Sequence, residues 1–150
     1  MNLFLKLFVG LFLVFILSGC IGEEYDFTPP TVTLNDYPSL SEELIEANID
    51  WRIENNEQLK KETEDILSFA REQKQFHINS GQKVSYDFDN QDFAIKELNV
   101  SVWKNDNEIK LELYDERSFH FPEEEGKYVI VFDLHSDRGI AQYVGNIAIQ

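Results

Sequence analysis

The sequence predicts a mainly β protein with one helix, built as an antiparallel β-sandwich. Short segments in which apolar and polar residues alternate recur along the chain, and Gly, Asn, Asp or Ser residues separate them. Short strands and turns at this spacing are typical of antiparallel sandwiches. Only one stretch has apolar residues at helical spacing. The composition, 43% hydrophobic and 13% aromatic, is that of a globular protein, and the length suits a single domain, which we place at residues 31–150.

The start of the chain has the pattern of an export signal. Lys6 precedes an apolar stretch from Leu7 to Leu17, and the run Leu17-Ser18-Gly19-Cys20 ends it. A membrane-spanning helix needs about 20 apolar residues, whereas this stretch has eleven, so a removable signal is the better interpretation. The run resembles the lipobox of bacterial lipoproteins, in which a peptidase cuts before a cysteine that carries the lipid. We therefore expect residues 1–19 to be removed by cleavage between Gly19 and Cys20, and Cys20 to be lipidated.

Lipidation would place the domain on the extracytoplasmic face of the bacterial cell membrane, held by an N-terminal diacylglyceryl anchor. Cys20 is the only cysteine, so the domain has no thiol for a disulfide or for catalysis. Removal of residues 1–19 takes away Lys6 and no acidic residue, which leaves 28 acidic and 12 basic side chains and a formal charge of −16. A surface of this charge repels nucleic acid and anionic lipid, so we exclude nucleic-acid binding.

The first elements of the domain follow a tether. Residues 20–30 are acidic and end in Pro29-Pro30, which predicts a short, stiff connection. Thr31 to Leu34 alternates as a first strand. Strict alternation from Ile45 to Ile53 predicts a strand with one solvent-exposed face. Between them, Ser39-Leu40-Ser41-Glu42 resembles a capping box, so a helical turn before the second strand stays open as an alternative.

The one predicted helix lies near residues 57–73. Asn55-Asn56 would cap its start, and a narrow stripe of mostly apolar side chains follows at helical spacing among charged residues. The members of this stripe are Leu59, Thr63, Ile66, Leu67 and Ala70. We expect the stripe to pack on a sheet of the same domain, and a partner-binding helix is the alternative.

The rest of the chain predicts strands separated by turns. Tyr128 to Leu134 is apolar on both sides, which predicts a central strand. The other predicted strands cover residues 76–78, 84–88, 95–103, 109–113, 119–121 and 140–149.

A short motif before the central strand refines the architecture. Glu124-Glu125-Gly126-Lys127-Tyr128 resembles the tyrosine corner of immunoglobulin-like sandwiches, in which the Tyr hydroxyl bonds to nearby backbone. Gly126 and Tyr128 are therefore predicted to form a structural corner, and Trp103 suits the core. The usual disulfide pair is absent from the sequence, so this is not an antibody-type domain.

Several segments together resemble a group of uncharacterised lipoproteins from Bacillus-type bacteria. The resemblance covers most of the chain after the signal and implies a lipid-anchored, immunoglobulin-like β-sandwich. It implies no activity and no catalytic residue. The matching segments are Pro29-Pro30-Thr31-Val32 after the lipobox, Ser80-Gly81-Gln82-Lys83-Val84, Gly126-Lys127-Tyr128-Val129, and Gly139-Ile140-Ala141-Gln142-Tyr143-Val144-Gly145-Asn146.

Known catalytic and metal-binding patterns fit the chain poorly. Ser80-Gly81-Gln82-Lys83 matches the Ser-x-x-Lys pair of penicillin-recognising enzymes, but it lies in a turn before a strand, and neither Ser-Asp-Asn nor Lys-Thr-Gly occurs. His77, His120 and His135 lack the close spacing of zinc ligands. We therefore predict no catalytic residue and no cofactor.

The acidic turn at residues 87–92 is a candidate cation site. Asp87, Asp89 and Asp92 supply oxygen ligands, but the Gly and Glu positions of an EF-hand loop hold Asp92 and Leu98. A looser calcium-binding loop therefore stays open beside an ordinary solvated turn.

The function that these observations favour is non-catalytic. We expect a lipid-anchored module that binds or regulates another envelope protein, with no nucleic-acid partner. Two alternatives stay open: an envelope enzyme that acts on cell-wall polymer through paired carboxylates, and a module that binds a small ligand or calcium.

Overall fold

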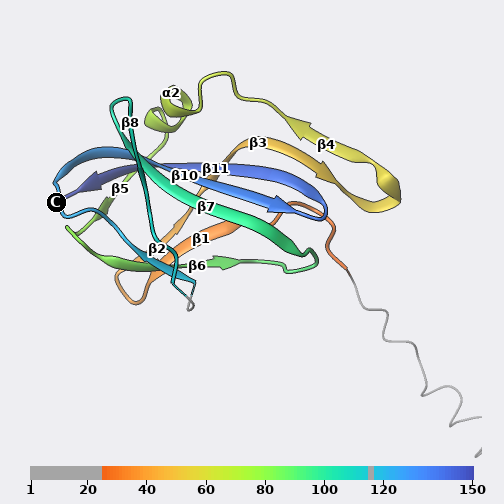
Figure 1. The fold of residues 1–150 in the computed structure, drawn as a ribbon, viewed down its shortest axis with the longest axis horizontal. Coiled ribbons are helices and arrows are strands. Elements are labelled where there is room, and N and C mark those ends of the chain that lie inside the picture. The colour runs from red at the N-terminus through yellow and green to blue at the C-terminus, as the bar shows by residue number, and fades with distance from the viewer. Residues whose placement is uncertain (1–24, 115–116) are drawn as a thin grey trace, which may run out of the picture.

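The computed structural model describes residues 25–114 and 117–150, which form two β-sheets packed face to face (Figure 1). The predicted mainly β sandwich is therefore confirmed. One sheet has four strands and the other has seven. The one α-helix of these described residues, α2 (Ile66–Arg71), lies on the side of the larger sheet that faces away from the smaller one.

The smaller sheet is antiparallel, with its strands in the order β2-β1-β6-β9. These strands are β2 (Leu40–Glu43), β1 (Val32–Asp36), β6 (Lys83–Phe88) and β9 (Ser118–His120). Alternation turns Val32 and Leu34 of β1 toward the core. Because β2 is a strand, the alternative of a helical turn at residues 39–42 is wrong.

The larger sheet has the order β4-β3-β11-β10-β7-β8. Its antiparallel strands are β4 (Gln58–Lys61), β3 (Ile45–Arg52), β11 (Gly139–Ile149), β10 (Gly126–Ser136), β7 (Ile95–Lys104) and β8 (Asn107–Lys110). The short strand β5 (Gln75–Ile78) pairs with the end of β11 in parallel, on the edge that β3 leaves free. The predicted central strand is confirmed, because β10 lies between β11 and β7.

The core lies between the two sheets and is rich in aromatic rings. Phe132 of β10 is fully buried and meets Tyr86 edge to face at 5.1 Å and Phe88 at 6.1 Å between ring centroids. Edge-to-face contacts of this kind add to the stabilisation that burial provides. Trp51 of β3 closes one end of the core, where its ring meets Phe93 at 5.4 Å.

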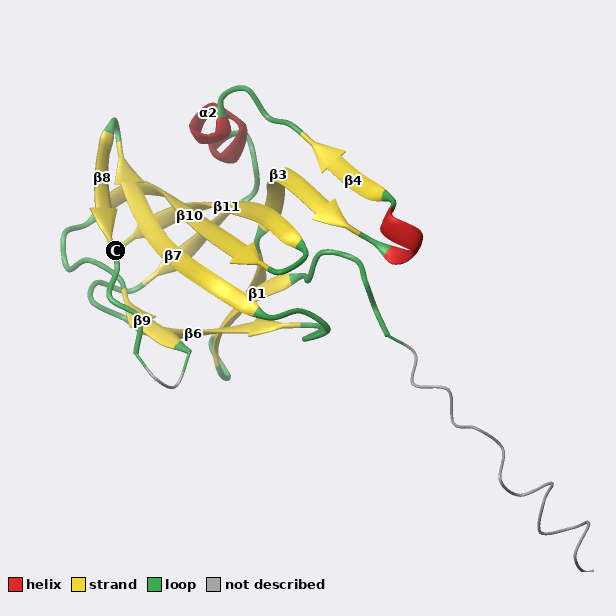
Figure 2. Ribbon diagram, turned by 45° about the vertical axis from the view of Figure 1, so that its right-hand side comes forward, coloured by secondary structure: helices red, strands yellow, loops and turns green. Residues whose placement is uncertain are grey.

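The predicted helix at residues 57–73 is wrong in its first half. Asn55 and Asn56 adopt positive φ angles in the short 3₁₀ turn Glu54–Asn56, which sends the chain back along β3 as strand β4. Leu59, the first member of the expected stripe, is 40% exposed. The helix begins only after Asp65, whose side chain accepts from the Ser68 amide and caps it. Backbone pairing with β3 thus prevailed over helical spacing in residues 58–61 (Figure 2).

The predicted tether at residues 20–30 also ends earlier than expected, because Pro29 and Pro30 are buried against the sandwich. The Trp51 indole donates to the carbonyl oxygen of Phe27 at 3.1 Å, and the Tyr143 hydroxyl donates to that of Pro30 at 2.5 Å. Residues 26–31, which we call the N-terminal segment, are therefore part of the folded domain.

Candidate functional site

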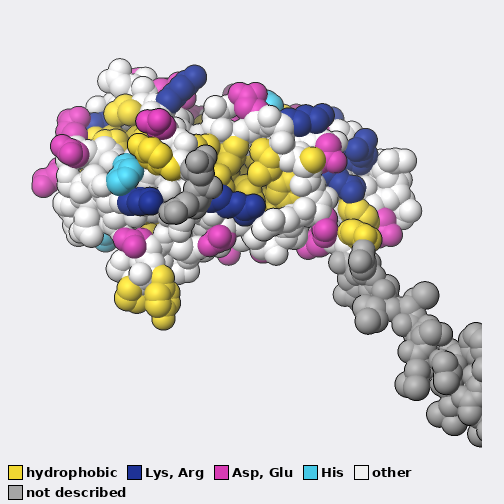
Figure 3. All heavy atoms as spheres, turned by 60° about the horizontal axis from the view of Figure 1, so that its bottom comes forward, with side chains coloured by type: hydrophobic (Ala, Val, Ile, Leu, Met, Phe, Trp, Pro, Cys, Tyr) yellow, Lys and Arg dark blue, Asp and Glu magenta, His cyan; other side chains and the backbone are white. Residues whose placement is uncertain are grey.

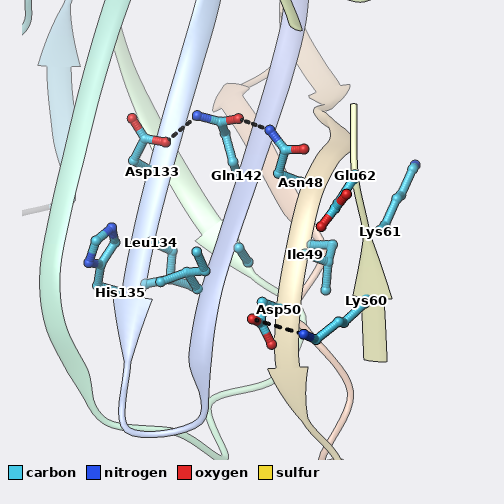
Figure 4. A pocket seen from close by; sticks show the side chains of 12 residues that line it. Asn48, Ile49, Asp50, Lys60, Lys61, Glu62, Asp133, Leu134, His135 and Gln142 are labelled. Atoms are coloured by element: carbon cyan, nitrogen blue, oxygen red, sulfur yellow. Dashed lines mark hydrogen bonds and ion pairs between the residues drawn. The ribbon is translucent and has the colours of Figure 1, made fainter. Parts of the chain in front are cut away.

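A hollow of about 390 Å³ lies on the outer face of the large sheet, and we call it the outer hollow. Side chains of β10, β11 and β3 form its floor, and β4 with the residue after it forms one wall (Figure 4). It is lined by Asn48, Ile49, Asp50, Lys60, Lys61, Glu62, Asp133, Leu134, His135, Ile140, Ala141 and Gln142.

The floor of the outer hollow is ordered by a chain of hydrogen bonds across three strands, which we call the polar chain. Gln142 Nε2 donates to Asp133 Oδ1 at 2.7 Å, and Asn48 Nδ2 donates to Gln142 Oε1 at 2.7 Å. Asn48 Oδ1 in turn accepts from the Thr63 amide at 2.6 Å. Every member is half-buried, and these bonds fix the rotamers of the side chains (Figure 4).

The wall of the outer hollow carries charge of both signs. Asp50 accepts from the Gln58 amide group and lies 3.9 Å from Lys60 Nζ. Lys61 Nζ donates to the carbonyl oxygen of Glu46 at 2.6 Å and lies 5.8 Å from the centroid of the Phe69 ring. Both lysines are therefore held along the rim.

The outer face of the large sheet is apolar at one end and polar at the other, and the outer hollow lies at the polar end. On β10, Val129 and Val131 are buried beneath α2 together with Ala47, Ala70 and Val144. Asp133 and His135 continue the same face of β10, because they lie at the same alternation. No residue of α2 lines the outer hollow. One half of the outer face thus packs against α2 and the other half stays open.

The geometry suits recognition by hydrogen bonding. Each amide of the polar chain uses one N–H and one oxygen within the chain, which leaves a second N–H on Asn48 and on Gln142. Asp133 keeps Oδ2, and the exposed His135 ring lies beside it on β10. Donors and acceptors in a fixed arrangement on strands can form hydrogen bonds to a polar group.

The acidic turn has a structural role in the domain. Asp89 Oδ1 accepts from the Thr31 amide at 2.6 Å, Asp92 Oδ2 accepts from the Asp26 amide at 2.7 Å, and Asp87 Oδ2 accepts from Asn35 Nδ2 at 2.8 Å. The three carboxylates therefore face three different donors and do not converge. Within residues 25–114 and 117–150, no three His, Cys, Asp or Glu side chains are grouped as a metal site.

Gly126 and Tyr128 lie at the start of β10. The Tyr128 hydroxyl donates to the carbonyl oxygen of Glu124 at 2.9 Å. Lys104 Nζ donates to Glu124 Oε1 at 2.5 Å and lies over the Tyr128 ring. That hydrogen bond to Glu124 raises the pKa of Lys104. Gly126 has φ +145°, and a Cβ there would lie 3.0 Å from Lys104 Cε.

The remaining candidates are dispersed. Ser80 donates to the carbonyl oxygen of Glu123 at 2.5 Å and lies in the turn before β6, so Ser80 and Lys83 do not share a helix turn. His77 and His120 lie on β5 and β9, away from His135. Gly19 and Cys20 lie outside the described residues. In the part of the chain that the structure describes, no helix is long and apolar enough to cross a membrane.

The residues of the polar chain were not singled out from the sequence. Asn48 was expected only on the exposed face of its strand. Asp133 interrupts the run Tyr128 to Leu134, which the sequence predicts to be apolar on both sides, and this carboxylate in a central strand is the available signal. Gln142 gave none, because its role depends on the register of β11 between β10 and β3.

No protein-family model, curated protein or solved structure matches this chain.

Proposed function

We propose that this chain is a lipid-anchored lipoprotein of the bacterial cell membrane whose β-sandwich is a non-catalytic binding module for another envelope component. The lipobox-like run ending at Cys20 supports the anchor and the extracytoplasmic location. The outer hollow supports the binding role, and the polar chain Asn48–Gln142–Asp133 is the observation that carries it. We further infer that the sandwich is immunoglobulin-like, supported by the Tyr128 bond to Glu124.

A binding role accounts for the carboxylates better than catalysis does. Asp133 accepts from an amide, and Asp50 accepts from an amide and lies near Lys60. Groups held in this way position a partner. The polar chain is already ordered. An envelope protein with complementary donors and acceptors would therefore bind with little rearrangement of these side chains.

The anchor is tested by mass spectrometry of the protein from membranes. We expect the mass of a chain that begins at Cys20 with a diacylglyceryl group, and a Cys20→Ala variant that is not lipidated. A chain that retains residues 1–19, or an unmodified thiol at Cys20, would contradict the anchor.

The binding role is tested by photo-crosslinking in intact membranes. A photoreactive residue at Ile140, which is 46% exposed in the outer hollow, is compared with one at Ile109, which is 38% exposed on β8. We expect one defined crosslinked envelope component from position 140 and none from position 109. Equal products at both positions, or wall-hydrolysing activity of the purified protein without any crosslink, would contradict the proposal.

A further inference from the structure

A second hollow, of about 590 Å³, lies on the outer face of the small sheet, and we call it the Tyr37 hollow. It is lined by Asn35, Asp36, Tyr37, Lys83, Ser85, Asp87 and Ser118. We propose that the Tyr37 hollow binds an uncharged oligosaccharide of pyranose rings. This site is separate from the outer hollow and goes beyond the function proposed above.

The first observation is an aromatic ring in solvent. Tyr37 lies in the turn between β1 and β2 and is 93% exposed, the highest fraction among the exposed large hydrophobic residues of the described chain. The ring therefore contributes no packing to the core. The face of an aromatic ring is electron-rich, so it attracts the C–H groups on the apolar face of a pyranose. Seen from the side of the small sheet, a hydrophobic group projects from the edge of the molecule (Figure 3).

The second observation is a row of small polar side chains beside that ring. Ser41, Asn35, Ser85 and Ser118 are register partners across all four strands of the small sheet. Three steps between neighbouring strands make a row of roughly 14 Å. Hydroxyl and amide groups both donate and accept hydrogen bonds, as the neighbouring hydroxyls of a sugar require.

The polar row is held in place, and one of its groups lacks a partner. Asn35 Nδ2 donates to Asp87 Oδ2 at 2.8 Å, and Ser85 Oγ donates to the backbone oxygen of Asn35 at 3.0 Å. Ser118 is 2% exposed, and its hydroxyl has no hydrogen-bond partner among the residues that the structure describes. A buried hydroxyl without a partner is costly, and a polar group that enters the hollow can supply one.

The same face disfavours other classes of ligand. β1 pairs with β2 and β6, and β6 pairs with β1 and β9, so the two strands that supply most of the lining have no free backbone edge. An added peptide strand would have to pair along the outer edge of β2 or β9 and not on the face that holds the hollow. Polyanions are repelled because the chain has 28 acidic against 13 basic residues. The two carboxylates of the lining already accept from side-chain amides, Asp36 from Gln82 and Asp87 from Asn35. These observations favour an uncharged ligand that is held by side-chain hydrogen bonds and one aromatic ring.

The test is a titration of the isotope-labelled full chain, held in a zwitterionic detergent without sugar groups, with maltohexaose, cellohexaose and chitohexaose. We expect at least one sugar to shift the NMR signals of the Tyr37 ring and of the Asn35 and Ser85 amides. Tyr37→Ala should weaken its affinity by about tenfold or more, while Tyr37→Phe, which keeps the ring, should retain it within about twofold. Both variants should fold, because Tyr37 is outside the core.

Tyr25→Ala is the matched control, since Tyr25 is 57% exposed and does not line the hollow. It should leave the sugar affinity unchanged. The proposal is overturned if none of the three sugars shifts these signals at millimolar concentration, or if Tyr37→Ala binds as tightly as the wild type. It is equally overturned if a proline-rich peptide, and no sugar, shifts the Tyr37 and Asn35 signals. None of these outcomes affects the crosslinking test at Ile140, which lies on the other sheet.

Discussion

Individual hydrogen bonds hold the N-terminal segment to the sandwich, and Tyr143 makes the most buried of them. Its side chain is fully buried, and burial raises the pKa of its hydroxyl far above the usual range, so the group stays a neutral donor. The hydroxyl donates to the carbonyl oxygen of Pro30 at 2.5 Å. Removal of this donor leaves a buried carbonyl without its partner.

We therefore expect Tyr143→Phe to lower the free energy of unfolding by about 1–3 kcal/mol. Tyr37→Phe removes the same atom from a ring that is 93% exposed and should leave stability unchanged. Urea unfolding monitored by circular dichroism measures both variants. Equal stability of the two would show that the Tyr143 contact contributes nothing.

Gly139 is the residue at which backbone geometry allows no side chain. It has φ +142°, and a Cβ would lie 2.0 Å from the carbonyl oxygen of Asp50 on β3. Gly139→Ala should destabilise the fold by about 2–3 kcal/mol or more, because β11 must move away from β3. Gly81→Ala is the control, since Gly81 has φ +66° but its nearest neighbour would lie at 3.4 Å. Thermal unfolding measures both variants. A larger loss of stability in Gly81→Ala than in Gly139→Ala would contradict the close packing of β11 against β3 at Gly139.

At the scale of elements, two carboxylates of the acidic turn at residues 87–92 bind the N-terminal segment at separate places. Asp89 accepts from the Thr31 amide and Asp92 accepts from the Asp26 amide. Asp89→Ala should therefore speed hydrogen exchange at Thr31 by about tenfold and leave Asp26 unchanged. Asp92→Ala should do the reverse. Exchange that rises at both amides in either variant would mean that the segment detaches as one unit.

The short helix α2 depends on its cap, and the cap gives a pH dependence. Hydrogen bonds from the Ser68 amide and hydroxyl lower the pKa of Asp65. A carboxyl whose pKa is lower in the folded state stabilises the fold at pH values above its unfolded pKa, about 4. That contribution is lost as the pH falls through the lower, folded-state pKa.

Asp65→Asn should remove this part of the acid dependence, because Asn caps a helix without titrating. The measurement is the free energy of unfolding between neutral and acidic pH in both proteins. Glu64→Gln, next to the cap on an exposed residue, is the control and should keep the wild-type slope. The same slope in Asp65→Asn as in the wild type would contradict the assignment of the cap.

At the scale of the whole molecule, alternation in the sequence was enough to predict the sandwich. The period of two from Ile45 to Ile53 and the apolar run at Tyr128 became β3 and the central β10. Residues 57–61 were misread because Leu59 fits a helical stripe, whereas the left-handed Asn55 and Asn56 return the chain along β3. That pairing is a tertiary effect, which local spacing does not contain.

The candidate site was harder to predict than the fold, for a related reason. Asn48, Gln142 and Asp133 come from strands that are far apart in the sequence, and strand register alone brings their side chains together. Turn chemistry did identify Asp87, Asp89 and Asp92 as a group. It did not reveal that each would accept a hydrogen bond from a different part of β1 or of the N-terminal segment.

The most direct measurement is the yield of the crosslink from position 140 in membranes when the polar chain is broken. Gln142→Ala removes the amide that joins Asn48 to Asp133, whereas Asn107→Ala removes an exposed amide on β8 and is the control. If the outer hollow is the binding site, the Gln142 variant should lose most of the crosslinked partner and the Asn107 variant should keep it. Undiminished yield in a folded Gln142→Ala protein would contradict the proposed site.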